Sequence, residues 1–463
     1  MKILLLMPYF DTPKKILPPI GLGYIASALE KRGYNVTVKD FQIEYVPMSK
    51  AIKQIVDEHY DAIGISTITD NRFNAIELIR QVKQKDNRIF IFVGGPHFSA
   101  TAIDALKNIR EIDVVVRNEG EITACELLDA YYEQRSFESV LGITFRDYRD
   151  NIIENPDRPL VNNIDKIEAP AWHLFKMEKY NYSFDDSGLP FIGLMSSRGC
   201  PYSCAFCANS THSIRFRTPS KFVDEIQHLK ERYSFEGFIF LDSTFTVNHN
   251  HVVQICEEII KRGLKIKWQA GARVSSVDRK ILALMREAGC FRVTYGIESG
   301  SEKILKNVNK GIDMQQIREA IHISSELGFD ISAFFMVGFP DENLNELKKT
   351  IKLIKELDTY KGCKSIYGFT VIYPNTEIEK IAQERNILPK NFSWNTYQIF
   401  PKYIFTDTSK TVPYYEDSLK IEMIKFYMII YRYNFSWHTI KILYTRLLQN
   451  LKKIFNRTLI QRT

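Results

Sequence analysis

The first 135 residues alternate between short apolar runs and longer amphipathic stretches. The apolar runs have the length and composition of buried strands and lie at 3–7, 36–38, 61–66, 89–93 and 113–116. The amphipathic stretches have helical spacing and lie at about 22–32, 48–59, 72–84, 98–108 and 121–134. Five such strand–helix units predict an α/β domain with a doubly wound parallel sheet, whose ligands bind beyond the carboxyl ends of the strands.

Residues 136–190 have the pattern of a connector. Two short β-type runs at 142–147 and 151–156 are separated by polar residues, which predicts a hairpin. Pro156, Pro159 and Pro170 stiffen the chain that follows. We expect this segment to carry the chain from the first domain to the second.

From 191 to 400 the alternation resumes with a longer period. Strands are predicted at 191–196, 237–241, 265–270, 292–297, 331–337 and 366–373. Helices are predicted at about 219–233, 250–262, 278–288, 313–327, 343–357 and 376–384. Six strand–helix units predict a partial (β/α)6 barrel of the TIM-like type, in which the carboxyl ends of the strands carry the chemistry.

The last segment, 401–463, has neither glycine nor cysteine, and it becomes helical in pattern from Glu416 onward. Apolar and basic residues alternate at helical spacing between Ile440 and Phe455. This pattern suits a packing helix with a solvated basic face, and it also suits a helix that lies on an anionic membrane surface. Both interpretations stay open at the level of sequence.

The bulk composition is that of a globular protein with two to four domains. The chain has 463 residues, with 45% hydrophobic and 25% charged residues and a net charge of +7. The charge permits an anionic substrate or membrane surface and does not require nucleic acid. The apolar run between Met1 and Pro8 is too short for a secretory leader, and no run approaches the length of a membrane span. These features predict a cytoplasmic protein, with the basic tail as its one candidate for peripheral membrane contact.

Three of the seven cysteines lie close together in one loop. Cys200, Cys204 and Cys207 have Cys-x3-Cys-x2-Cys spacing and follow a predicted buried strand. Soft thiolates at such short intervals suit an iron–sulfur cluster or zinc. A closed zinc site needs a fourth ligand, and His212 is the nearest candidate, at an unpersuasive offset. An odd cysteine count with such a cluster argues against a disulfide framework and fits a reducing compartment.

This cysteine stretch resembles the signature of the radical S-adenosylmethionine (SAM) enzymes. Its flanks match as well, with Gly199 before the first cysteine, Pro201 after it and Phe206 before the last. The resemblance implies a [4Fe–4S] cluster held by three thiolates, with the amino and carboxylate groups of SAM on the fourth iron. A reductase or a flavodoxin-type protein would supply the electron.

The ends of the predicted barrel strands resemble the same family, in the same order along the chain. The resemblance implies that Asp242 accepts from the amino group of SAM and that Arg273 pairs with its carboxylate. A turn cap and a surface salt bridge are the simpler alternatives for these two residues. Glu298 would contact the ribose or the amino group. The remaining expected SAM contacts are Phe206 beside the cluster, Gly338 near the adenosine and Tyr373 near the adenine.

The first domain resembles the cobalamin-binding domain found at the N-terminus of many radical SAM enzymes. Short motifs at the predicted strand ends carry this resemblance, and the residues expected to bind cobalamin are Pro19, Gly21, Leu22, Ser66, Thr67, Gly94, Gly95, His97, Glu119 and Gly120. For His97 a loop-capping role is an equal alternative. No histidine precedes His59, which lies in a predicted helix, so the lower face of cobalt should lack a histidine ligand. A Rossmann-like nucleotide domain is the alternative, but the tight Gly-x-Gly-x-x-Gly turn after the first strand is absent.

The two resemblances together imply an enzyme that cleaves SAM reductively and uses cobalamin to methylate an unactivated carbon of a small molecule or lipid. Cyclisation or another oxidative rearrangement is the alternative reaction in the same family. An iron–sulfur protein that only transfers electrons or senses redox state is the alternative of another class. The residues at the strand ends argue against it, because an electron carrier needs no barrel mouth. The sequence has no aromatic–basic signature of nucleic-acid binding.

Overall fold

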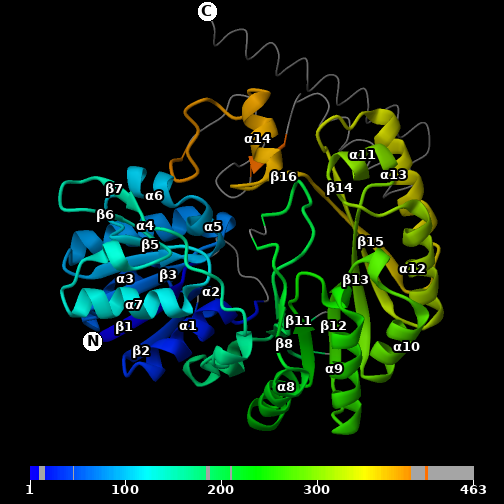
Figure 1. Ribbon diagram of the computed structural model, residues 1–463, viewed down its shortest axis with the longest axis horizontal. Coiled ribbons are helices and arrows are strands. Elements are labelled where there is room, and N and C mark those ends of the chain that lie inside the picture. Colours follow the sequence, from blue (N-terminus) through cyan, green and yellow to red (C-terminus); the bar gives the residue numbers. More distant parts are fainter. Residues whose placement is uncertain (10–15, 45, 184–187, 209–210, 398–411, 415–463) are drawn as a thin grey trace, which may run out of the picture.

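The computed structural model describes residues 1–9, 16–44, 46–183, 188–208, 211–397 and 412–414. Two α/β domains stand side by side, and the segment that carries the three cysteines rises between them (Figure 1). Both predicted domain architectures are confirmed. The predicted helices of the tail lie outside the described residues. No helix in the described ranges is long and apolar enough to cross a membrane.

The N-terminal sheet has the strand order β2-β1-β3-β4-β5-β6-β7. Its first five strands are parallel and match the predicted positions: β1 (Lys2–Met7), β2 (Asn35–Asp40), β3 (Ala62–Ser66), β4 (Phe90–Gly94) and β5 (Val114–Val116). The inner strands β1, β3, β4 and β5 consist mainly of apolar residues because helices bury both faces of the sheet, whereas the edge strand β2 is more polar and less buried.

Two separate cores form on the two faces of this sheet. One face packs against α1 (Ile20–Lys31) and α7 (Gly120–Tyr132). The other packs against α3 (Met48–Asp57), α4 (Arg72–Lys85) and α6 (Ala102–Asn108). Each fully buried aliphatic side chain contributes roughly 1.5–3 kcal/mol. The short helices α2 (Phe41–Glu44) and α5 (Gly95–Ala100) complete the domain, so the single helix predicted at 98–108 is in fact α5 and α6, divided at Thr101.

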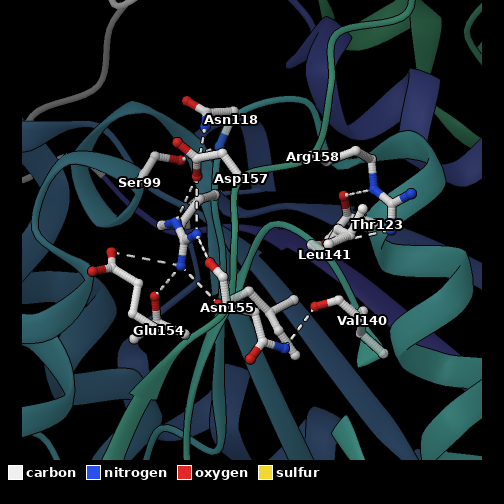
Figure 2. A network of polar contacts seen from close by, with 12 residues as sticks. Ser99, Asn118, Thr123, Val140, Leu141, Glu154, Asn155, Asp157 and Arg158 are labelled. Atoms are coloured by element: carbon white, nitrogen blue, oxygen red, sulfur yellow. Dashed lines mark hydrogen bonds and ion pairs between the residues drawn. The ribbon is translucent and has the colours of Figure 1, made fainter. Parts of the chain in front are cut away.

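The predicted hairpin at the start of the connector belongs to the first domain. Its strands extend the N-terminal sheet: β6 (Ile143–Arg146) pairs antiparallel with β5, and β7 (Ile152–Glu154) pairs antiparallel with β6. Polar contacts fasten the chain that follows: Asn155 donates to the carbonyl of Val140 at 2.7 Å, and Arg158 donates to Thr123 at 2.8 Å (Figure 2). The sheet is therefore mixed, and it continues past the boundary expected at residue 135.

The second domain is an open barrel of six parallel strands in the order β15-β14-β13-β12-β11-β8. The strands are β8 (Phe191–Leu194), β11 (Gly237–Phe240), β12 (Lys267–Ala272), β13 (Cys290–Glu298), β14 (Asp330–Val337) and β15 (Cys363–Phe369). The helices α8 (Pro219–Tyr233), α9 (His249–Lys261), α10 (Arg279–Glu287), α12 (Met314–Glu326) and α13 (Leu344–Leu357) pack outside, as the alternation predicts.

A smaller layer covers the upper end of the barrel (Figure 1). It contains α11 (Glu302–Asn307), α14 (Glu377–Glu384) and the paired strands β16 (Val371–Ile372) and β17 (Val412–Pro413). These elements share a separate apolar cluster with Ala205, the residue after the second motif cysteine. The cysteine loop is thus packed into the fold at its middle.

A polar contact beyond α14 joins the two domains. The carboxylate of Asp104 accepts hydrogen bonds from the hydroxyl of Ser393 and from the backbone N–H groups of Trp394 and Asn395, at 3.0 to 3.2 Å. Arg72 donates to the carbonyl of Trp394 at 3.0 Å. We call residues 393–395 the clasp, because they close over the N-terminal domain from the side of the barrel.

Candidate cofactor site

The cysteine loop leaves the first barrel strand through a short antiparallel ribbon. Strand β9 (Ser197–Arg198) pairs with β10 (Arg215–Phe216), and the three cysteines lie between them. Gly199 opens the loop with φ of +93°, and a Cβ there would lie 2.3 Å from the carbonyl oxygen of Ser213. Only glycine fits this backbone position, which explains the Gly-Cys pair at the start of the motif.

The three motif thiols are accessible and lie in no disulfide. Cys200 and Cys204 are partly exposed and Cys207 is exposed. No three His, Cys, Asp or Glu side chains converge on a single ion position within the described ranges. In a [4Fe–4S] cluster each thiolate binds a different iron atom, so its ligands surround a volume instead of meeting at one point. The remaining cysteines are structural: Cys125, Cys256 and Cys290 are buried, and Cys363 starts β15.

Backbone contacts fix the middle of the loop. The N–H of Ala205 donates to the carbonyl of Val308 at 3.0 Å, and the carbonyl of Ala205 accepts from the N–H of Ile378 at 3.1 Å. Phe206 packs against Phe339 with 5.7 Å between ring centroids. Phe206, expected beside the cluster, therefore rests on the residue that follows Gly338.

Asp242 supports the segment that leads from the first barrel strand into the cysteine loop. Its carboxylate accepts from the N–H of Ser196 at 3.2 Å, from the hydroxyl of Ser196 at 2.8 Å and from the hydroxyl of Ser197. Burial raises the pKa of Asp242, while the hydrogen bonds from Ser197 and Ser196 oppose the rise. These hydrogen bonds give Asp242 a structural role at the start of the loop, and its expected contact with the amino group of SAM stays a prediction.

Arg273 lies against the cysteine loop. It follows β12, and its guanidinium carbon is 3.9 Å from the ring centroid of Tyr202, which lies between the first two motif cysteines. Its Nε donates to Ser275 at 3.1 Å. Its terminal nitrogens have no hydrogen-bond partner among the described residues, so a two-pronged donor suited to a carboxylate remains available.

Glu298 ends β13 and forms a buried ion pair that the sequence did not predict. Lys310 donates to Glu298 at 2.7 Å, and its ammonium lies 5.7 Å from the ring centroid of Phe206. Glu298 has a left-handed backbone with φ of +69°, which is uncommon for a residue with a side chain. The pair places a charged group from each of two segments beside the cysteine loop. Nothing in the local sequence distinguishes Lys310 from an ordinary loop lysine.

The last two expected SAM contacts are Gly338 and Tyr373. The N–H of Gly338 donates to the carboxylate of Glu342. Tyr373 follows β16, and its pKa is raised by burial and then by the charge of Asp70 in the first domain. Tyr373 therefore faces the boundary between the domains.

The ends of β3 and β4 in the N-terminal domain meet as predicted. Ser66 and Gly94 are paired in register, and a Cβ on Gly95 would lie 2.8 Å from the Ser66 hydroxyl and the Thr67 backbone. The hydroxyl of Thr67 is buried and has no hydrogen-bond partner in the described chain. An unpaired buried hydroxyl beside this close backbone approach fits a polar ligand at the carboxyl edge of the sheet.

At the start of α1 only part of the predicted set is accessible. Pro19 precedes the helix, and a Cβ on Gly21 would meet nothing within 4 Å, so the backbone there is open. Leu22 is instead buried in the core. A Cβ on Gly120 would lie 3.0 Å from Ile25, so Gly120 serves the packing of α7 on α1. The packing explains both residues without a ligand, and their expected contacts with cobalamin stay predictions.

Two further expected cobalamin contacts have partners inside the protein. His97 is fully buried, with Nδ1 3.3 Å from the hydroxyl of Thr69 and Nε2 3.2 Å from Oδ1 of Asn395 in the clasp. Glu119 pairs with Arg198 and Arg215 of the cysteine ribbon. Both residues join the domains, a role that only tertiary structure reveals.

His59 lies far from the ligand edge. Helix α3 ends at Asp57, so His59 is not helical as predicted but follows the helix with φ of +52°. It is exposed and precedes β3, which places it at the amino end of that strand. The expectation that no histidine binds cobalt from below stays a prediction, and the placement of His59 is consistent with it.

The fold and the site define a class: proteins that join a cobalamin-type α/β domain to an open barrel with a three-cysteine loop. A model of the B12 binding domain matches residues 8–128, and a model of the Radical SAM superfamily matches residues 194–354. The Uncharacterized methyltransferase PH0819 of Pyrococcus horikoshii is 34% identical over 407 residues, which cover 86% of each chain. The chain belongs to the family of cobalamin-binding radical SAM enzymes.

Other relatives extend this comparison. The anaerobic magnesium-protoporphyrin IX monomethyl ester cyclase of Rubrivivax gelatinosus is 29% identical over 73% of this chain and 62% of its own. Two solved structures share the fold. TsrM from Kitasatospora setae has a TM-score of 0.69 and 18% sequence identity, and the match covers 83% of this chain and 75% of that one. OxsB with aqua-cobalamin has a TM-score of 0.76 and 19% sequence identity, and the match covers 93% of this chain and 66% of that one. The family's cofactors are a [4Fe–4S] cluster, SAM and cobalamin.

The described residues fit these three groups. Three accessible thiols on an anchored loop could bind the cluster, and the unpaired terminal nitrogens of Arg273 could bind the carboxylate of SAM. The open backbone at Gly21 and the unpaired hydroxyl of Thr67 could contact cobalamin. Of the predicted positions, Phe206 lies within the cysteine loop, Arg273 lies against it, and Glu119 pairs with the ribbon that carries it.

Proposed function

We propose that the protein is a methyltransferase that transfers a methyl group through cobalamin to an unactivated carbon of a small molecule or lipid. The observation that carries this proposal is the match to PH0819, which spans both cofactor domains and is named a methyltransferase. Two more distant relatives, a cytidylyl-2-hydroxyethylphosphonate methyltransferase and a hopanoid C-3 methylase, have names that point the same way.

Oxidative cyclisation is the second candidate reaction. Among the relatives that support it are three anaerobic magnesium-protoporphyrin IX monomethyl ester cyclases, which are 28% to 30% identical over 73% to 84% of this chain. The two reactions differ in their SAM products. Methylation with turnover of the methyl donor yields S-adenosylhomocysteine as well as 5′-deoxyadenosine, whereas cyclisation needs no methyl group.

The residues of this chain would have separate roles in holding the cofactors. Bound cofactors supply the electron and the methyl group, and the protein holds and shields them. Cys200, Cys204 and Cys207 would hold the cluster, and Arg273 would orient SAM through its carboxylate. Glu298 and Lys310 would present a rigid polar wall beside SAM, since their mutual ion pair fixes both side chains.

The test is anaerobic reconstitution with iron, sulfide and hydroxocobalamin, followed by desalting, an absorption spectrum and turnover with SAM and dithionite. We expect retained corrinoid and formation of both 5′-deoxyadenosine and S-adenosylhomocysteine. Deoxyadenosine without S-adenosylhomocysteine would favour cyclisation, and loss of corrinoid would end the methyl-transfer proposal. SAM cleavage by a variant with all three motif cysteines changed to alanine would overturn the assignment of the cluster.

A further inference from the structure

Two arginines flank the cysteine loop and reach the same point of the N-terminal domain. Arg198 on β9 and Arg215 on β10 face each other in the ribbon. Both terminal nitrogens of Arg215 donate to the carboxylate of Glu119 at 2.9 Å. Arg198 donates to Glu119 at 3.2 Å and to Glu121 at 2.6 Å. We call these four residues the ribbon clamp.

The ribbon clamp is shielded from water. The side chains of Arg198, Arg215, Glu119 and Glu121 are 14%, 6%, 20% and 10% exposed. The guanidinium of Arg198 also lies 4.7 Å from the ring centroid of Tyr24. Charges in such an environment are weakly screened, so removal of one partner leaves a poorly compensated charge behind.

The position of the clamp connects the sites of two cofactors. Arg198 precedes Cys200 by two residues, so their Cα atoms are within about 7 Å of each other. Glu119 immediately precedes α7 and follows β5, at the sheet edge where doubly wound domains bind ligands. The clamp is neutral as a whole, with two positive and two negative groups.

We propose that Glu119 and Glu121 are positioning residues, which hold the cysteine loop against the cobalamin-binding domain and balance the arginine charges beside the cluster. The proposal deepens the proposed function, but it rests on the family's cofactors and not on which reaction they perform. It gives Glu119 a role different from a direct contact with cobalamin.

The charge balance predicts the direction in which the midpoint potential of the cluster shifts when one side of the clamp is neutralised. Reduction adds an electron, so uncompensated positive charge nearby stabilises the reduced form and uncompensated negative charge destabilises it. The double variant Glu119→Gln, Glu121→Gln leaves two arginines unbalanced and should raise the midpoint potential. The double variant Arg198→Met, Arg215→Met leaves two carboxylates and should lower it.

The experiment is a redox titration of the reconstituted full-length protein without substrate, followed by electron paramagnetic resonance of the reduced cluster. A matched control is Asp104→Asn, which weakens the contact with the clasp elsewhere between the domains and should leave the potential unchanged. Shifts of opposite sign in the two double variants would support the clamp. Shifts of the same sign, unchanged potentials, or an equal shift in the control would overturn it.

A second measurement covers variants that bind too little cluster for titration. In that case iron per chain is compared among folded proteins, as judged by circular dichroism, and the single variant Glu121→Gln replaces the double one in the titration. Loss of iron in the Glu119 and Glu121 variants but not in Asp104→Asn supports the positioning role, and equal loss in all of them contradicts it. Neither readout depends on methyl transfer, so failure of the clamp and failure of the proposed function are distinguishable.

Discussion

The ammonium group of Lys310 lies 2.7 Å from a carboxylate oxygen of Glu298, and neither side chain is more than one-tenth exposed. Glu298 holds this position with a left-handed backbone, a conformation that costs of order 1–3 kcal/mol and persists only where surrounding structure enforces it. Such strain at the carboxyl end of a barrel strand marks a position constrained by more than packing.

This pair predicts an asymmetric response to substitution. Glu298→Gln leaves the Lys310 ammonium buried without its counter-charge and should lower the free energy of unfolding by about 3–5 kcal/mol. The double variant Glu298→Gln, Lys310→Met removes the orphaned charge and should recover much of that loss. Denaturant unfolding of the cofactor-free protein, followed by tryptophan fluorescence, measures both. A double variant no more stable than Glu298→Gln would show that the charge is not the cause.

The stacking of Arg273 on Tyr202 predicts a specific effect on SAM. A cation–π contact contributes about 0.5–2 kcal/mol, so Tyr202→Leu should raise the KM for SAM roughly 2- to 30-fold by releasing the guanidinium. Tyr202→Phe keeps the ring and should behave like the native protein. Arg273→Lys removes the planar fork and should raise the KM further. If Tyr202→Phe and Tyr202→Leu gave the same KM in a SAM-cleavage assay, the stacked ring would have no part in SAM binding.

The backbone conformation at Gly199 predicts that a side chain at this position disturbs the cysteine loop and lowers iron binding. Gly199→Ala would bring a Cβ to 2.3 Å from the Ser213 carbonyl in addition to the cost of φ at +93°. We expect the variant to fold but to bind well under half the native iron on reconstitution. Gly33→Ala is the matched control, since Gly33 has φ of +87° and open space around it. It carries only the backbone cost, about 1–2 kcal/mol, and should bind iron normally. Equal iron content in the two variants would refute the steric argument.

Local pattern predicted the elements of both domains well. The helix expected at 219–233 is α8 at Pro219–Tyr233, because its apolar residues repeat at helical spacing and proline starts it. The hairpin at 142–156 was also recognised, but its sequence could not show that β6 joins β5. That pairing depends on the surface that the rest of the sheet presents, which is a tertiary property.

The sequence predicted site residues only where their chemistry depends on their spacing along the chain. The three cysteines follow from their intervals, whereas the partners of Glu119 and Asp242 lie 96 and 46 residues away along the chain, in Arg215 and Ser196. A glutamate before a helix fits a ligand contact or an ion pair equally well until its neighbour is known. Sequence placed these residues at the correct edge and could not choose between the two roles.

The buried histidine at the clasp predicts a pH dependence of stability. Burial, and then the charge of Arg72, lower the pKa of His97 to about 3, whereas an unfolded histidine titrates near 6.5. Between these values the unfolded chain binds one proton more, so the stabilisation is complete above pH 6.5 and is lost as the pH falls toward 3. The slope should approach about 1.4 kcal/mol per pH unit near pH 5. His97→Gln should remove this slope, while Thr69→Val, which keeps the imidazole, should retain it. Urea midpoints measured from pH 4 to 7 test this, and a constant difference between native protein and His97→Gln across that range would contradict the assignment.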